Sequence, residues 1–219
     1  MVSHLAGTSV SVAPIIGSAP DYDAIAYAAA AGRPLDTALA ETGDAGVVER
    51  AIAALREFWR LKIIPARHLT ADALRRLGAE SCALTSLTVP TTTNAARRTL
   101  ARLDARTPHF DLCPIHADMK LEHLFVDGEM ATLIDTESVS LGPPDYDLAQ
   151  LYGRLWQADL EGQLSRDLVE KASATIRAKA GDSFDWCLDV VALRLAKFYA
   201  QRPTEDAAEK INAILDRLS

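Results

Sequence analysis

Two polar segments in the middle of the chain, residues 116–123 and 133–137, are attached to short apolar runs. The runs cover residues 110–115, 125–126 and 130–134, and the pair Asp127-Gly128 separates the last two. Apolar runs this short, bounded by turn residues, predict short strands, and a tight turn between two of them predicts a hairpin. We therefore expect a small stranded centre that carries polar loops at its strand ends.

Helical patterns surround this centre. Apolar residues recur at three- or four-residue spacing over residues 45–61, which predicts an amphipathic helix. A short helix is expected over residues 70–77, and the Thr-rich stretch 85–93 is expected to connect it to a helix capped by Thr93 or Asn94. The remaining predictions are a strand over residues 9–16 and helices over residues 93–106, 145–157, 163–179, 185–202 and 205–218. The chain is thus predicted to be an α+β fold, with a helical body around a stranded centre.

The composition is that of an ordinary globular domain. The chain has 219 residues, 49% of them hydrophobic and 24% charged, which is enough for one domain with a full core. No apolar run approaches the roughly 20 residues that span a bilayer, and residues 1–17 do not read as a secretory signal, so we expect a cytoplasmic location and no membrane contact. The net charge of −7 opposes nucleic-acid binding and is compatible with a cationic substrate. Cys82, Cys113 and Cys187 lie far apart among apolar residues, which predicts buried free thiols.

The two polar segments resemble the catalytic loop and the metal-binding segment of the protein-kinase superfamily. Residues 116–123 read His-Ala-Asp-Met-Lys-Leu-Glu-His, similar to the loop pattern H-x-D-x-x-x-x-N. Residues 133–137 read Leu-Ile-Asp-Thr-Glu, similar to the I-D-x-E of aminoglycoside phosphotransferases and choline kinases. The resemblance implies a protein-kinase-like fold that uses ATP and Mg²⁺.

This resemblance assigns roles to individual residues. Asp118 corresponds to the catalytic base, Lys120 to the cation that neutralises the transferring phosphate, and Asp135 to the principal magnesium ligand. Glu137 corresponds to an acidic residue that assists near the metal. His123 stands where the family has Asn, and its imidazole can bind a metal although it is a softer ligand than Mg²⁺ prefers.

Two further residues are expected to support the loop from behind. His116 corresponds to the loop histidine. Residues 142–149, Gly-Pro-Pro-Asp-Tyr-Asp-Leu-Ala, resemble the G-D-P-x-x-D-L-A segment, whose last Asp hydrogen-bonds the catalytic loop, and this match falls on Asp147. Simpler roles also fit, because Asp147 can cap a helix, Lys120 and Glu122 can form an exposed pair, and Trp59 can serve packing alone.

The N-terminal part resembles a shortened nucleotide-binding lobe. Residues 25–35 are similar to the last N-lobe strand and the hinge, where the backbones of Ala28 and Ala30 would meet the adenine edge, although an alanine run alone favours helix. Residues 1–27 contain no Gly-rich loop, and no lysine precedes Lys62. Residues 1–32 are therefore expected to form a reduced N-lobe with its hinge, and residues 33–219 a helical C-lobe with the catalytic loop and metal-binding segment.

The resemblance implies a phosphotransferase that moves the γ-phosphate of ATP to a hydroxyl of a small molecule or of a peptide Ser or Thr, as in natural-product biosynthesis or antibiotic modification. One alternative is a pseudokinase-like binding subunit, whose short N-lobe leaves a strand edge that a partner chain or a second copy would complete. A third hypothesis is a zinc or manganese hydrolase that uses His116, Asp118, His123 and Asp135. The hydrolase hypothesis leaves Lys120 without a role.

Overall fold

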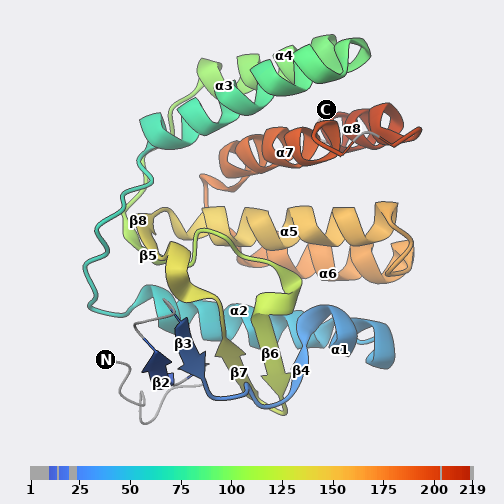
Figure 1. Cartoon of the computed structure of the whole chain (residues 1–219). Coiled ribbons are helices and arrows are strands. Elements are labelled where there is room, and N and C mark those ends of the chain that lie inside the picture. Colours follow the sequence, from blue (N-terminus) through green and yellow to red (C-terminus); the bar gives the residue numbers. More distant parts are fainter. Residues whose placement is uncertain (1–9, 14, 20–23, 203, 218–219) are drawn as a thin grey trace.

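The computed structural model of the protein describes residues 10–13, 15–19, 24–202 and 204–217. The helices are stacked in layers above a small sheet (Figure 1). The four-stranded sheet has the order β1-β7-β6-β4, in which β1 runs parallel to β7 and the other pairs are antiparallel. These strands are β1 Val10–Val12, β4 Arg33–Pro34, β6 Leu124–Asp127 and β7 Met130–Leu133.

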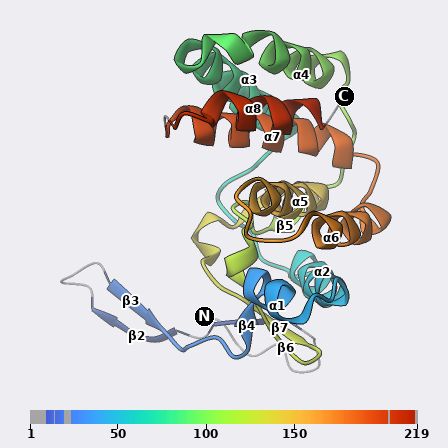
Figure 2. The same cartoon turned by 90° about the vertical axis from the view of Figure 1, so that its right-hand side faces the viewer.

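Two further strand pairs flank this sheet. The antiparallel pair β5 (Cys113–Ile115) and β8 (Ser140–Gly142) brackets the two polar segments. The hairpin of β2 (Ile15–Ala19) and β3 (Ala24–Tyr27) projects away from the helical body (Figure 2). Two of its large apolar side chains, Ile16 and Tyr27, are exposed.

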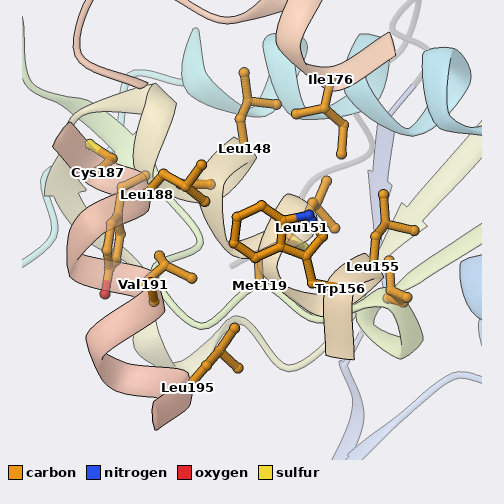
Figure 3. Packing of buried hydrophobic residues seen from close by; sticks show 14 of the residues in the cluster. Met119, Leu148, Leu151, Leu155, Trp156, Ile176, Cys187, Leu188, Val191 and Leu195 are labelled. Atoms are coloured by element: carbon orange, nitrogen blue, oxygen red, sulfur yellow. The ribbon is translucent and has the colours of Figure 1, made fainter. Parts of the chain in front are cut away.

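The helices form the body of the molecule. They are α1 Leu35–Thr42, α2 Gly46–Trp59, α3 Ala71–Thr88, α4 Thr93–Ala105, α5 Pro144–Leu160, α6 Arg166–Lys179, α7 Phe184–Ala200 and α8 Ala207–Asp216. Short 3-10 turns are η2 Pro90–Thr92, η3 Leu121–His123 and η4 Thr136–Ser138. Helix α2 packs on the sheet and on α6, α5 packs between α6 and α7, and α3 and α4 pack on the far side of α7. One continuous hydrophobic cluster joins these layers, and Figure 3 shows its part between α5 and α7.

Most of the predicted helices are confirmed. Helix α2 covers the predicted range within two residues at its C-terminal end, and Val48, Ile52 and Leu55 are buried as their spacing requires. The four C-terminal helices lie where they were expected, although Leu218, the predicted end of the last one, is outside the described residues. The predicted α+β architecture is present.

The predicted helix over residues 70–77 is too short, and the predicted connection over 85–93 is wrong. Thr70 does cap α3, accepting a hydrogen bond from the Ala73 amide at 3.3 Å, but the helix continues to Thr88. The helix continues through Gly78. A Cβ at that position would lie 2.7 Å from the side chain of Leu103, so the glycine allows α3 to pack closely on α4. Thr85 is fully buried within α3.

The predicted cap of the next helix is also wrong. Helix α4 begins at Thr93 itself, directly after the turn η2, and its N-cap residue is Thr92, whose side chain makes no capping bond to the helix. The hydroxyl of Thr92 donates instead to the carbonyl of Val89 at 2.8 Å. Helix α4 therefore starts directly from turn η2 without a side-chain cap.

The N-terminal prediction of a single strand over residues 9–16 is wrong. Within that range, of which Ser9 and Pro14 lie outside the described residues, the chain forms β1 and the start of β2. The strand expected before the hinge is present as β3, which pairs with β2, and the alanines that follow it at residues 28–31 form neither helix nor strand. The elements β4, α1 and β8 were not predicted. Over the described residues, no helix is both long and apolar enough to cross a membrane.

The three cysteines are free, and Cys82 and Cys187 are buried as predicted, whereas Cys113 is partly exposed. Burial, with a smaller contribution from the charge of Asp147, raises the pKa of Cys113 from 9.0 to about 12. Because the thiolate is the reactive form, we expect Cys113 in the native protein to react with iodoacetamide at pH 8 about a thousandfold more slowly than in the urea-unfolded chain. Peptide mass spectrometry after timed labelling measures both rates, and equal rates would contradict the raised pKa of Cys113.

Candidate active site

The segment that joins β5 to β6 carries Asp118 and Lys120 on its surface. The ammonium Nζ of Lys120 lies 3.5 Å from Oδ2 of Asp118, and each side chain is about one-third exposed, at 28% and 33%. Glu122, the expected surface partner of Lys120, forms no ion pair with it among the described residues. Lys120 therefore pairs with the carboxylate that the sequence assigned as the base.

Asp147, in the first turn of α5, holds the segment in place from below. Its carboxylate accepts hydrogen bonds from the backbone amides of His116 and Ala117, both at 2.9 Å, and it is fully buried. Burial raises the pKa of Asp147, while the charge of His116 and the N–H donors act in the opposite direction. The contact expected for Asp147 is present, and its functional role stays a prediction.

The backbone between these anchors has an unusual conformation. Ala117, directly before Asp118, has φ +68°, a left-handed value that costs a residue with a Cβ roughly 1–2 kcal/mol. The amide of Ala117 donates to Asp147, and its carbonyl accepts from the amide Nε2 of Gln150 at 3.1 Å. The strained residue is thus held on both sides, which fixes the direction in which Asp118 leaves the loop.

Two residues that the sequence interpretation did not assign to the site complete this support. The indole Nε1 of Trp59, which was expected to serve packing alone, donates to Asp147 at 3.0 Å. Gln150 lies one helical turn after Asp147, and its Oε1 accepts from the amide of Met119 at 3.1 Å. The three-residue spacing of Asp147 and Gln150 on one helix face was the available signal for Gln150.

Two histidines join this loop to the segment after β7. His116 is buried, and its Nε2 lies 2.8 Å from the carbonyl of Ile134. His123 places Nδ1 3.0 Å from the carbonyl of Asp118, and Nε2 3.2 Å from Oδ2 of Asp135. Asp135 itself has a left-handed backbone with φ +57°. Both predicted acidic residues, Asp118 and Asp135, are therefore positioned through His123.

The donor atoms around Asp135 suit a cation. A carbonyl oxygen only accepts, so Nδ1 of His123 carries the proton, and burial lowers the pKa of His123, which favours the neutral ring. The lone pair on Nε2 then faces the carboxylate of Asp135, an arrangement that a shared cation would stabilise. Among the described residues no three His, Cys, Asp or Glu side chains converge to hold an ion, so the protein supplies few ligands. Mg²⁺ typically binds in this way, through one or two protein ligands together with phosphate oxygens and water.

The same ligand count disfavours the zinc hydrolase hypothesis. A catalytic zinc site uses three protein ligands, and no such group of side chains is present in the described part of the chain. His116 is directed at the carbonyl of Ile134. Its other nitrogen, Nδ1, is buried without a hydrogen-bond partner.

A cavity of about 340 Å³ lies between the segment that follows β3, the expected hinge, and the end of β7. It brings together Ala28 and Ala30 from the hinge with Asp135 and Glu137 from the opposite wall. Gly32 has φ +88°, and a Cβ there would lie 2.3 Å from the carbonyl oxygen of Val126, so only glycine lets the hinge pass this close to β6. Four residues that the sequence placed around nucleotide and metal thus line one cavity.

Comparisons with known proteins agree with this arrangement. A model of the phosphotransferase enzyme family matches residues 1–181. A thermostable mutant of aminoglycoside phosphotransferase APH(4)-Ia superposes with a TM-score of 0.72 at 14% identity, covering 98% of this chain and 79% of its own. A choline/ethanolamine kinase family protein from Mesorhizobium loti gives 0.65 at 15% identity, with coverage of 95% and 73%.

Choline kinase LicA from Streptococcus pneumoniae is also similar, with a TM-score of 0.61 at 12% identity over 94% of this chain and 74% of its own. A comparison with curated proteins found no match. At these identities the solved structures establish the fold alone, and the family match extends over most of the chain. The expected protein-kinase-like fold is confirmed, and the chain belongs to the phosphotransferase enzyme family.

Proposed function

We propose that this protein transfers the γ-phosphate of ATP to a hydroxyl group of a small molecule. The observation that carries the proposal is the connection through His123, which contacts the backbone of Asp118 on one side and the carboxylate of Asp135 on the other. One side chain thus sets the relative position of the proposed base and the proposed metal ligand. A structural relative was solved with AMP-PNP and hygromycin B, which supports nucleotide and small-molecule binding in this fold.

Each proposed role follows from the position of the side chain. Asp118 accepts the proton of the acceptor hydroxyl as its oxygen forms a bond to the γ-phosphorus, the bond from the γ-phosphorus to the β,γ-bridging oxygen breaks, and ADP leaves. Lys120, 3.5 Å from Asp118, lies where it can neutralise the transferring group. Ala28 and Ala30 line the cavity, and their backbones would meet the adenine edge there. Gln150, Trp59 and Asp147 hold the loop.

Asp135 and His123 would hold Mg²⁺, with Glu137 beside them on the cavity wall. The ion, when bound, supplies positive charge next to the β- and γ-phosphates. The exposed carboxylate of Asp135 leaves coordination positions open for phosphate oxygens and water.

The defining experiment measures ADP release from ATP and Mg²⁺ with a panel of small alcohols, together with mass spectrometry of the products. We expect a phosphorylated alcohol to form in amounts equal to the ADP released. ADP release without a phosphorylated product, with every acceptor, would contradict the proposal.

The change Asp135→Ala tests the metal site directly. Removing a residue that merely supports a metal ligand weakens metal binding about 10–100-fold, so losing the ligand itself should weaken it at least about 100-fold. Calorimetry of ATP binding with and without Mg²⁺ measures the effect, and Glu129→Ala, an exposed acidic residue in the β6–β7 turn, is the matched control. Unchanged magnesium dependence in Asp135→Ala would exclude Asp135 as a ligand.

A pseudokinase-like subunit is the second candidate, and one observation favours it. None of the described residues that line the hinge cavity is Lys or Arg, and the projecting hairpin exposes 69% of Ile16 and 43% of Tyr27. A partner chain or a second copy that covers this hairpin could supply a cation for the phosphates. Calorimetry with ATP and Mg²⁺ on the purified chain separates the candidates, because micromolar binding without a partner disfavours the subunit role.

A further inference from the structure

Two arginines meet in a small cavity beside the catalytic loop. On α5, Gln150 and Arg154 are four residues apart and share one helix face, and on α7 the same is true of Arg194 and Phe198. The cavity between these faces measures about 120 Å³. It is lined by Gln150, Arg154, Val191, Arg194, Leu195 and Phe198. Figure 3 shows Val191 and Leu195 on the side of α7 that faces α5.

The cavity adjoins Asp118 through the backbone. Gln150 contributes to its wall and binds both neighbours of Asp118, accepting from the amide of Met119 and donating to the carbonyl of Ala117. Burial is the largest influence on the pKa of Arg154 and lowers it, Tyr146 is the largest influence on the pKa of Arg194 and raises it, and the charge of Asp118 contributes a smaller upward shift to both. The positive pair therefore lies within electrostatic range of the proposed base.

Both arginines are partly buried, and over the described residues their side-chain hydrogen-bond partners are neutral. The Nη1 of Arg154 donates to Oε1 of Gln157 at 2.6 Å, and the Nη1 of Arg194 donates to the hydroxyl of the buried Tyr146 at 2.5 Å. Over the described residues neither arginine forms an ion pair with a carboxylate. The nearby Glu161 is bonded instead to Gln157 and Tyr199, both at 2.9 Å.

Like charges that approach each other in a partly desolvated site destabilise the protein unless an anion compensates them. Burial is the largest cause that lowers the pKa of Arg154, the charges of Glu122 and Asp118 raise it, and Arg194 lowers it as a smaller, like-charge contribution. Each guanidinium has further N–H donors that can bind a carboxylate or phosphate in a bidentate manner. The volume is below the roughly 300 Å³ at which pockets for whole drug-sized ligands begin, so it suits one small anionic group.

We propose that Arg154 and Arg194 bind the acceptor, and that the acceptor is a small alcohol carrying a carboxylate or phosphate group. This inference rests on the proposed phosphotransferase activity and specifies its substrate class. It runs against the expectation from net charge, because the chain carries −7 overall while this cavity is locally positive. A cationic acceptor, such as choline or an aminoglycoside, would meet two positive charges here.

The first test compares ADP release with glycerate, glycerol and choline at equal concentrations. We expect glycerate to stimulate release, and Arg154→Gln and Arg194→Gln each to raise the KM for glycerate at least about tenfold while the KM for ATP stays within twofold. Arg98→Gln, an exposed arginine on α4, removes the same charge and should match the wild type. Preferential phosphorylation of choline, or an unchanged KM for glycerate in both variants, would overturn the inference while leaving the proposed function standing.

The second test needs no turnover. Calorimetry with inorganic sulfate on the nucleotide-free protein should show binding that each arginine variant weakens at least about tenfold and that Arg98→Gln leaves unchanged. Arg194→Gln removes a hydrogen bond to the buried Tyr146 and can disturb folding, whereas Arg154→Gln removes, among the described residues, only a hydrogen bond to Gln157 and therefore serves as the independent test. Equal sulfate binding in all variants overturns the anion site. Arginine-dependent binding without phosphate transfer to any alcohol supports the anion site and counts against the proposed function.

Discussion

Asp118→Asn is expected to lower kcat by about 10²–10⁴-fold, the range typical for loss of a general base. Asparagine has the same shape but cannot take the proton of the acceptor hydroxyl. The hydrogen bond from His123 goes to the backbone carbonyl of Asp118, so the substitution leaves the connection to Asp135 intact. The KM for ATP should therefore stay close to the wild-type value. Initial rates of ADP release with an accepted alcohol measure both constants.

The matched control is Asp127→Asn, which removes the same charge from an exposed position at the end of β6. It should leave kcat within twofold of the wild type. An unchanged kcat in Asp118→Asn would remove Asp118 from the reaction. A rise in the KM for ATP with kcat unchanged would instead assign its charge to binding.

The central motifs could be predicted from sequence because their chemistry and their order are local. The apolar runs on either side of Asp127-Gly128 do form the hairpin of β6 and β7, and the polar segments follow strand ends as expected. The contact of Asp147 with the loop was also anticipated, since the match covered a contiguous segment. What local sequence could not supply is the pair of histidine contacts that join the two segments, because each depends on how the chain returns after β7.

Tertiary packing decided the elements that sequence reasoning missed. Gly78 and the threonines after it argue locally against a long helix, yet α3 runs through them because its face packs closely on Leu103 of α4 and on α7. Helix α1 is only eight residues long and follows a two-residue strand, so its periodicity is too brief to detect. Its burial of Leu35 and Leu39 stabilises it within the fold.

The arginine pair could not be predicted from the sequence either. Arg154 and Arg194 lie 40 positions apart, and nothing around either one marks it as a binding residue. They meet because α5 and α7 pack side by side, and Gln150 then brings their cavity to the catalytic loop. Under the proposed acceptor site, the preference for substrate charge depends on how two helices pack, whereas the residues proposed for phosphate transfer lie in two short segments of the sequence.

Asp147→Ala is expected to have the largest effect on stability. The change leaves two buried amide N–H groups, those of His116 and Ala117, and the partly buried indole N–H of Trp59 without an acceptor. Each buried donor costs about 1–3 kcal/mol, so the free energy of unfolding should fall by at least about 2 kcal/mol. Urea unfolding followed by circular dichroism measures this change. Trp59→Phe loses one donor and keeps an aromatic ring, so it should lose only about 1 kcal/mol.

The same substitution should also impair catalysis in molecules that remain folded. Without the carboxylate, one of the two bonds that hold Ala117 at φ +68° is lost, and the backbone can relax toward a common conformation. Asp118 would then leave its position beside Lys120, so kcat should fall together with stability even at low temperature, where the variant is fully folded. Trp59→Phe keeps both backbone contacts of Asp147 and should retain most of the wild-type kcat. If Asp147→Ala unfolds more easily yet turns over at the wild-type rate when folded, Asp147 supports the fold alone and the loop holds Asp118 without it.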